Sequence, residues 1–349
     1  MKRILNIVFV LFLTIAVLAS CGKNNLNSTS GNSQDSKSSV SSEVGKKKII
    51  CTIFPIYDWV REIVGENESN YDFTCLINNG VDLHNFNPSA SDIIDIQNSD
   101  MFIHVGGESD AWVNDVFNKV IEKDIVRLNL LELMGDRAKV EELKEGMEHE
   151  HEHEEGEHEE GEHHEEGEHE EELDEHVWLS LKNAKYLCDI IKDNIVKLDG
   201  ANKDKYETNY NKYCKMLDDL DAKFVEAANK ADTHVMLFGD RFPFRYLLDD
   251  YGIDYYAAFS GCSAESEASF KTIMFLANKI DELNLKHVLK IEGANDKIAK
   301  TIIENTKSKN QDSITMNSMQ AGTVNESKNG ATYLNIMESN LDAFGRALK

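Results

Sequence analysis

The stretch KIICTIFPIYDWVREIVG, residues 48–65, shows the pattern on which the fold is built. Its first part, 48–55, is a short apolar run rich in β-branched residues, which is typical of a strand. Its second part, 56–65, has the apolar spacing of a helix and ends in glycine. Strand-like runs follow at 71–77 and 101–105, and each is closed by an asparagine- or glycine-rich break. Strands that alternate with helices across short breaks predict a parallel sheet with helices on both faces.

The same alternation returns in the second half of the chain. Strands are expected at 234–238, 253–259, 287–291 and 313–317, and helices at 244–251, 267–284, 296–306 and 333–348. Between the halves, helical periodicity begins at 181, breaks near Gly200 and resumes from about 203 to 230. We predict an α/β fold of two similar lobes, residues 46–180 and 232–349, with a cleft between them. A helical linker over 181–231 joins the lobes, and its long second helix forms a stiff spine.

The N-terminus has the features of an export signal. Lys2 and Arg3 precede an apolar run over 4–19 that is short for a membrane-spanning helix. The small residues before Cys21 resemble a bacterial lipobox, in which that cysteine is lipidated and becomes the first residue. We therefore expect a signal peptide over 1–21, then a flexible Ser/Asn/Gly-rich tether over 22–45. The protein is predicted to be extracytoplasmic and anchored to the cell membrane through Cys21, and an uncleaved anchor helix is the alternative.

Residues 148–172 contain only Glu, His and Gly, with 15, 7 and 3 of each. Such a segment has no apolar residue with which to form a core, and it repels itself at neutral pH. A merely solubilising acidic run would explain the Glu but not the repeated His. Imidazoles and carboxylates bind divalent metals such as zinc, so we expect weak auxiliary metal binding here. The histidines concerned are His149, His151, His153, His158, His163, His164 and His169.

A match to the HExxH motif of metalloproteases lies inside this segment, at His149, Glu150 and His153. That motif needs a stable helix to place both histidines on one face. A polyanion interrupted by glycines is not expected to form one, so the protease interpretation is disfavoured.

Charge and cysteine content argue against a nucleic-acid-binding protein and against a disulfide-stabilised fold. Asp and Glu outnumber Lys and Arg by 63 to 37, which argues against nucleic-acid binding. Five cysteines remain after Cys21, at irregular spacing and without a CxxC pair, so a disulfide framework is not expected. We expect four of them to be small buried thiols, namely Cys51, Cys75, Cys188 and Cys214.

Three histidines outside the Glu/His segment deserve separate interpretation. His84 follows a predicted strand end, in GVDLHNFNP, where ligands of parallel sheets bind. His176 lies in LDEHVWLS, between acidic residues and an apolar anchor. His104 lies inside a predicted strand and is expected to pack in the core.

Several motifs together resemble the zinc/manganese solute-binding lipoproteins of ABC importers. They are the lipobox, NNGVDLHNFNPSASDI, the His-rich insert, DEHVWLSLKNA, FRYLLDDYG, EASFKTI and NGATYLNIMESNLDAF, in family order. The resemblance implies two α/β lobes joined by one long helix, with a metal in the cleft and no catalytic activity. It also implies an ABC permease and ATPase as partners, and we expect a monomer. His84 and His176 match the family's first two metal ligands, and the His-rich insert favours Zn2+ with Mn2+ as runner-up.

The second lobe departs from the family pattern. The family's third histidine precedes a short helix that ends in Tyr-Gly, but LFGDRFPFRYLLDDYG contains no histidine. Counting back from Tyr251 places Arg241, which cannot ligate a metal, at that position. Alignment by the strand end places Gly239 or Asp240 there instead. Where some members supply an acidic fourth ligand, ITMNSMQ offers only the weak donors Asn317 and Ser318.

Two histidines are too few for a tight zinc site, so a second-lobe donor is needed. Asp240 is our first choice, because it lies at a predicted strand end facing the cleft. Glu292 also ends a strand, and Cys262 lies in a glycine turn where a thiolate would suit zinc and exclude manganese. Arg241 is expected to pair with a carboxylate across the cleft. The full set of candidates is Asp240, Cys262, Glu265, Glu267 and Glu292.

Three alternatives to a zinc-capturing protein stay open at this point. A manganese or iron binder would use the same scaffold. A secreted zinc hydrolase would need an open metal position beside a general base, for which Glu175 next to His176 is the only hint. A surface adhesin or structural lipoprotein would leave the His-rich segment without an evident use.

Overall fold

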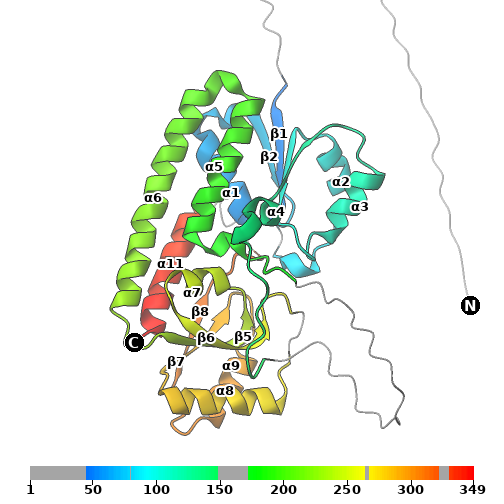
Figure 1. The fold of residues 1–349 in the computed structure, drawn as a ribbon. Helices are drawn as coiled ribbons and strands as arrows, with labels where there is room; N and C mark the ends of the chain where they lie inside the picture. Colours follow the sequence, from blue (N-terminus) through cyan, green and yellow to red (C-terminus); the bar gives the residue numbers. More distant parts are fainter. Residues whose placement is uncertain (1–44, 79, 148–171, 264–266, 322–329) are drawn as a thin grey trace, which may run out of the picture. The chain divides into compact units, whose positions relative to one another are not determined.

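The computed structural model describes residues 45–78, 80–147, 172–263, 267–321 and 330–349. Residues Gly45–Lys349 form one compact unit (Figure 1). Cys21 and the Glu/His-rich residues 148–171 lie outside the described part of the chain. Within the described part, no helix is long and apolar enough to cross a membrane.

The first lobe is built on a parallel four-stranded sheet of order β2-β1-β3-β4. Its strands are β1 (Lys47–Cys51), β2 (Tyr71–Cys75), β3 (Met101–His104) and β4 (Val126–Asn129). The helices that follow them are α1 (Phe54–Val64), α2 (Ala90–Gln97), α3 (Ala111–Lys119) and α4 (Leu130–Met134). Pro55 lies in the first turn of α1, where its missing N–H has no partner to lose, and Ser89 and Asp92 form a capping box that starts α2.

The second lobe repeats this arrangement with the order β6-β5-β7-β8, again parallel. Its strands are β5 (Val235–Phe242), β6 (Asp254–Ser260), β7 (His287–Ile291) and β8 (Asp312–Met316). Its helices are α7 (Arg245–Asp250), α8 (Phe270–Leu283), α9 (Lys297–Asn305) and α11 (Tyr333–Ala347). The two sheets have the same strand order. The first strand of each lobe, β1 or β5, lies between the second strand, β2 or β6, at one edge and the third strand, β3 or β7. The prediction of two similar α/β lobes is confirmed.

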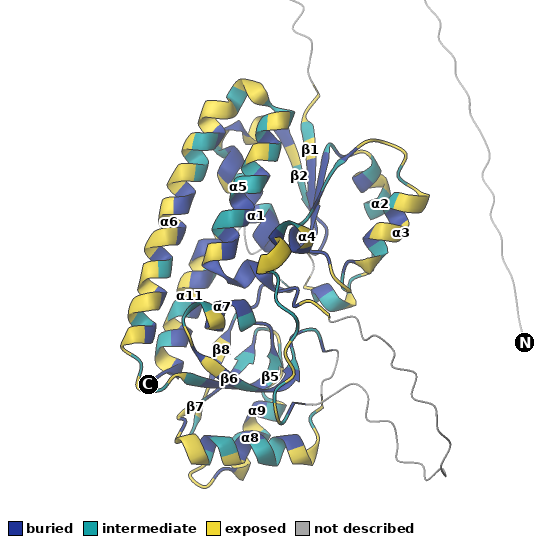
Figure 2. Cartoon of the chain, viewed as in Figure 1, coloured by how far each residue is buried: buried dark blue, intermediate teal, exposed yellow. Residues whose placement is uncertain are grey.

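Two helices connect the sheets, α5 (Leu181–Leu198) and the 27-residue α6 (Lys203–Asn229). The long α6 packs against α1 and α5 and also against α11 of the second lobe. Its buried side chains recur at helical spacing while the rest of its surface is exposed, as Figure 2 shows. They are Tyr206, Tyr213, Cys214, Leu217, Leu220, Phe224 and Ala228. The predicted long helix between the lobes is thus present.

Strand β5 is longer than the sequence indicated. The apparent break at Gly239 and Asp240 does not end the strand, which continues to Phe242 with a shift of register against β6 between Phe238 and Arg241. A side chain on Gly239 would meet the backbone of Ala299 in α9 at 2.8 Å. The glycine therefore allows close helix packing rather than a turn, and Asp240 lies inside a strand instead of at its end. The short elements β4, α3 and α4 were not predicted.

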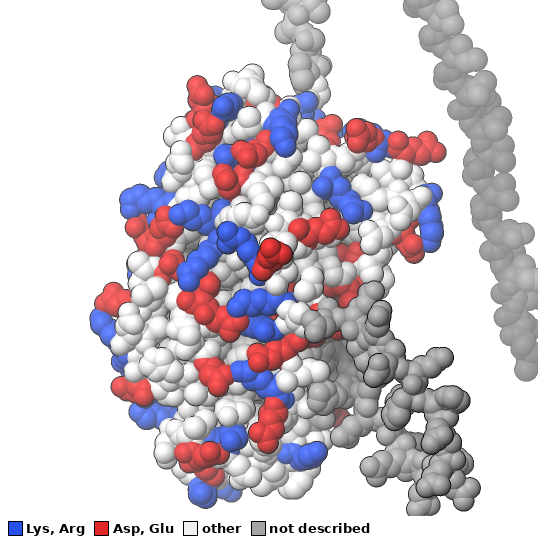
Figure 3. Space-filling view, in the orientation of Figure 1, with Lys and Arg blue, Asp and Glu red and all other residues white. Residues whose placement is uncertain are grey.

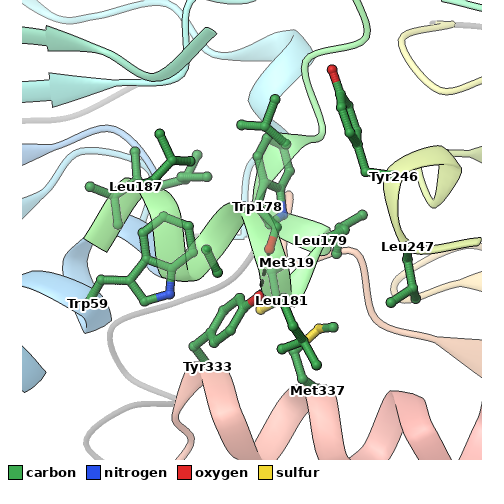
Figure 4. Close-up of a cluster of buried hydrophobic side chains, with 14 of the residues drawn as sticks. Trp59, Trp178, Leu179, Leu181, Leu187, Tyr246, Leu247, Met319, Tyr333 and Met337 are labelled. Carbon is green, nitrogen blue, oxygen red and sulfur yellow. Dashed lines mark hydrogen bonds between the residues drawn. The ribbon is translucent and has the colours of Figure 1, made fainter. Parts of the chain in front are cut away.

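One hydrophobic core extends across both lobes. Figure 4 shows its middle, where Trp178 lies among side chains of both halves, including Tyr333 and Met319. The indole N–H of Trp178 donates to the carbonyl of Ser318 at 2.8 Å, and the Tyr333 hydroxyl donates to the carbonyl of Trp178 at 2.7 Å. Truncating a buried aromatic residue of this kind costs about 3–5 kcal/mol. These contacts therefore hold the two lobes together close to His176, a residue of the predicted metal site.

The described surface mixes charges of both signs. On the face in Figure 3, Lys and Arg side chains are interspersed with Asp and Glu rather than gathered in one area. The five described cysteines are free thiols. Cys51, Cys75, Cys188 and Cys214 are buried, as expected, whereas Cys262 is half-buried.

Asp58 couples α1 of the first lobe to α11 of the second. Its carboxylate is 2 % exposed and accepts the Tyr333 N–H at 2.8 Å. Burial raises the pKa of Asp58 from 3.8 to about 7. Between these values the folded chain holds a proton that the unfolded chain has released. Stability contributed by this group is therefore present at low pH and is lost as the pH rises through the window.

We expect Asp58→Asn to flatten the dependence of stability on pH. The variant is neutral at every pH, so its free energy of unfolding should rise relative to that of the parent as the pH increases from about 4 to about 7. The limiting slope is about 1.4 kcal/mol per pH unit inside the window. Denaturant titrations at several pH values measure this, with exposed Asp124→Asn as control. Parallel pH profiles for Asp58→Asn and the parent would contradict the assignment.

Candidate metal centre

His84 is held at the end of the loop that leaves β2, in the 3-10 turn Leu83–Asn85. Asp82 caps this turn by accepting the His84 backbone N–H at 3.1 Å. The Nδ1 atom of His84 contacts the hydroxyl of Ser109 at 2.6 Å, and Ser109 lies in the loop after β3. His84 therefore depends on the loops that follow β2 and β3, the strands on either side of β1, at the end of the sheet where parallel sheets bind ligands.

His176 precedes the 3-10 turn Val177–Leu179 and is fully buried. Both its backbone N–H and its Nδ1 lie 2.9 Å from the same carboxylate oxygen of Asp174. Because a carboxylate accepts hydrogen bonds, Nδ1 is the donor and Nε2 keeps its lone pair. A carboxylate behind the ring is the usual partner of a metal-binding histidine.

The two imidazoles converge at their Nε2 atoms, which lie 3.3 Å apart. Two nitrogens about 2.05 Å from a tetrahedrally coordinated zinc would be separated by about 3.3 Å. Burial lowers the pKa of His84 well below its usual value, and the neighbouring His176 lowers it further. A neutral ring is the form that binds metals, so this pair matches two ligands of a zinc ion.

Cys262 brings a thiol to this pair from the second lobe. His84, His176 and Cys262 offer ligand atoms that all lie within 4.8 Å of one another. The approach depends on Gly261, where a side chain would meet the His176 ring at 2.8 Å. Burial raises the pKa of the Cys262 thiol, as do the nearby carboxylates of Glu175 and Glu141. A bound dication reverses that balance, because a coordinating thiol loses its proton.

Gln320, in the loop after β8, was not predicted as a site residue. Its side-chain nitrogen lies 2.8 Å from Nε2 of His84 and 2.6 Å from Nε2 of His176. An amide NH2 group has two N–H donors, one for each ring. The amide thus occupies the two lone pairs that a metal would use. Ser318 contacts the amide oxygen at 3.0 Å, and Glu292 in turn accepts the Ser318 N–H at 2.6 Å.

The other predicted second-lobe donors do not reach this group. The two carboxylate oxygens of Asp240 accept backbone N–H groups of Arg241 and Ile291, and so bind β5 to the end of β7. Glu292 accepts a hydrogen bond from the Ser318 hydroxyl, and Ser318 in turn contacts Gln320. Glu267 is exposed and pairs with Lys297 at 2.9 Å. Glu265 lies outside the described residues.

Arg241 forms the cross-cleft ion pair that the sequence predicted. Its guanidinium donates to Asp82 at 2.7 Å, and both side chains are less than one-fifth exposed. Burial raises the pKa of Asp82, but Arg241 and His84 lower it, and the net pKa is below its usual value. Arg241 also contacts the Ser263 carbonyl at 3.5 Å, beside Cys262. Arg241 therefore supports the backbone near the proposed ligands of both lobes, and it is not itself a metal ligand.

His104, predicted to pack in the core, is 2 % exposed and stacks on Phe102 with ring centroids 5.3 Å apart. It lies 3.5 Å from Asp110 and does not belong to the converging group.

Comparison with known proteins shows the family of this chain. Residues 49–347 match the family described as zinc-uptake complex component A, periplasmic. The chain belongs to this family. The family is one of solute-binding proteins for zinc uptake.

Two curated relatives are particularly informative. The high-affinity zinc uptake system protein ZnuA of Bacillus subtilis is 31% identical over 340 residues, covering 97% of this chain and 96% of that protein. The zinc-binding lipoprotein AdcA of Streptococcus pneumoniae (strain ATCC BAA-255 / R6) is 28% identical over 299 residues, covering 86% of this chain. The present chain spans only 55% of AdcA.

Among solved structures, the Zn(II)-bound ZnuA-like domain of Streptococcus pneumoniae AdcA superposes with a TM-score of 0.66. The identity is 24%, and the match covers 87% of this chain and 99% of that domain. This likeness confirms the two-lobed fold.

We expect Cys262→Ser to weaken zinc binding by about tenfold to a thousandfold, or about 1.4–4 kcal/mol. The neutral hydroxyl is a poor zinc ligand. Asp240→Ala should affect folding stability more than zinc affinity, because Asp240 binds backbone groups of β5 and β7. Competition titration with a chromophoric chelator measures the affinities, and thermal melts measure stability. A larger loss of affinity in Asp240→Ala than in Cys262→Ser would restore Asp240 as the second-lobe ligand.

Proposed function

We propose that this protein captures Zn2+ outside the cytoplasm and delivers it to an ABC permease with its ATPase. His84, His176 and Cys262 are the proposed ligands, with the side-chain oxygen of Gln320 as the fourth donor. One observation carries the proposal. Two buried imidazoles, each engaged at Nδ1, present their Nε2 atoms 3.3 Å apart beside a thiol.

The donor set supports zinc over manganese. Imidazole and thiolate are ligands of borderline and soft ions, whereas manganese prefers carboxylate, carbonyl and water oxygens. Among the described residues, the group that converges on one point contains two imidazoles and one thiol but no carboxylate. Two neutral imidazoles, one thiolate and one neutral amide would leave a zinc complex with a single positive charge.

Gln320 can become a ligand by rotating its amide about the last side-chain bond. Its nitrogen then leaves the two imidazoles and its oxygen faces the metal. The Ser318 hydroxyl has one proton, which it can donate either to Gln320 at 3.0 Å or to Glu292 at 2.7 Å. After the rotation that proton goes to Glu292, and the amide N–H donates to the Ser318 oxygen. Every polar group in this chain of contacts keeps a partner.

The hydrolase alternative is disfavoured by the position of Glu175. A general base must reach a metal-bound water, which would lie near the Nε2 atoms. One Glu175 oxygen accepts the Ser109 N–H at 3.0 Å, and the other lies 3.9 Å from Nδ1 of His84. Glu175 therefore lies on the far edge of the ring and orients it.

Membrane attachment through lipidated Cys21 would keep the protein next to its permease. The seven histidines of residues 148–172 are proposed as weak auxiliary sites that raise the local zinc concentration. We propose that these sites are weaker than the site formed by His84, His176 and Cys262.

The purified mature chain should bind about one Zn2+ tightly, in preference to Mn2+, and further zinc weakly. His84→Ala and His176→Ala should each abolish the tight step, whereas deletion of 148–172 should remove only weak steps. Isothermal calorimetry with chelator competition separates the two classes. Tighter binding of Mn2+ than of Zn2+ would refute the function, and loss of the tight step on deletion would move a ligand into 148–172.

Replacing the neutral amide by a carboxylate should shift selectivity. In Gln320→Glu the fourth donor is a harder, charged oxygen, so affinity for Mn2+ should rise by roughly tenfold or more relative to Zn2+. Gln311→Glu adds the same charge near the end of α9, away from the site, and serves as the control. An unchanged Zn2+/Mn2+ ratio in Gln320→Glu would remove Gln320 from the ligand set.

A further inference from the structure

A cavity of about 400 Å3 lies beside the proposed metal centre, between the start of α3 and the loop after β6. Cys262 forms part of its wall, so the cavity reaches a proposed ligand directly. The wall also contains four glutamates and includes no Lys or Arg among the described residues. The glutamates are Glu108, Glu141, Glu172 and Glu175.

We propose that this acidic cavity is the route by which hydrated divalent cations reach and leave the metal centre. The proposal rests on the function proposed above and adds a route to it. Zinc would enter from the side of α3, pass the glutamates and meet Cys262 before the two imidazoles. It would do so without separation of the lobes.

The opposite approach, across the cleft, is obstructed. Arg241 and Asp82 form their partly buried ion pair there, and the Leu83 N–H donates to the Gln320 carbonyl at 3.2 Å. Behind them lies the core that both lobes share around Trp178. Opening this side would break a cross-lobe ion pair, a backbone hydrogen bond and apolar packing together. The glutamate-lined cavity involves none of these contacts.

Glu175 gives the cavity wall a buried carboxylate, which lies on the Nδ1 side of the His84 ring. The residue is 1 % exposed, and its Oε2 has no hydrogen-bond partner among the described residues. The other oxygen of Glu175, Oε1, lies next to Gly107. A Cβ atom on Gly107 would come within 2.2 Å of this oxygen, and Gly107 also has a φ of +73°. Gly107 therefore has to be glycine for Glu175 to reach this position. A buried carboxylate oxygen without a donor is suited to a passing cation.

Glu141 links the cavity wall to the ligand turn, because its carboxylate accepts the Cys262 N–H at 3.2 Å. Glu108 and Glu172 are exposed at the outer part of the wall. A single carboxylate binds zinc weakly. The four glutamates of the wall would therefore act through electrostatic attraction of the cation rather than by holding it. Such a low-dielectric, single-sign passage raises association rates by about 10- to 1,000-fold, and salt weakens the effect.

The route is tested by the rate at which Co2+ alone reaches the thiol of the full mature chain. Thiolate-to-cobalt absorption reports arrival at Cys262, since residues 148–172 contain no cysteine. Ala111 is exposed on the cavity wall and touches no proposed ligand, so Ala111→Trp should obstruct the passage. Association and dissociation should both slow by roughly tenfold or more, with little change in affinity. Ala222→Trp, exposed on α6, is the matched control.

The charge is tested separately with Glu108→Gln combined with Glu172→Gln. Association should slow by roughly tenfold at low salt, and its salt dependence should flatten. Glu304→Gln, exposed on α9, should leave both unchanged. Rates equal to the parent in both Ala111→Trp and the double variant would overturn the route while leaving the tight site in place. A parent chain without a thiolate–cobalt band would overturn the proposed ligand set instead.

Discussion

The metal centre depends on the way each histidine is fixed by its Nδ1 atom. Asp174 accepts from His176, and Ser109 contacts His84, so both Nε2 atoms face the same point. Without these partners the rings could rotate, and the 3.3 Å separation of the two nitrogens would not persist. Ser109 in turn is positioned by Glu175, whose carboxylate accepts its N–H. The ligands are therefore prepared before a metal arrives, which lowers the cost of ordering them on binding.

The lobes contribute differently to this centre. In the proposed centre the first lobe supplies two imidazoles, and the second supplies a thiol and an amide from the loops after β6 and β8. Arg241, one of the residues that the sequence places at the position of the family's third histidine, joins the lobes by an ion pair with Asp82. We propose that the thiol of Cys262 takes the place of that histidine, because it lies within 4.8 Å of the ligand atoms of His84 and His176.

The fold could be predicted from the sequence, and so could the two histidines of the proposed site, because both rest on local patterns. Alternating apolar runs gave the two sheets, and His84 and His176 each lie in a distinctive motif. The second-lobe donors depend on tertiary packing that no local pattern reveals. Gly239 resembles a strand end but serves the packing of α9, so β5 continues through Asp240. Gln320 reaches the histidines after Met319 adopts a positive φ of 60°, which the sequence does not indicate.

X-ray absorption at the zinc edge of the loaded mature chain tests the central claim most directly, with 148–172 deleted to remove the auxiliary histidines. The account predicts one sulfur at about 2.3 Å and three nitrogen or oxygen atoms at about 2.0–2.1 Å, with scattering from two imidazoles. The sulfur contribution should vanish in Cys262→Ser. A parent spectrum with nitrogen and oxygen alone, or with a carboxylate in place of the sulfur, would contradict the account.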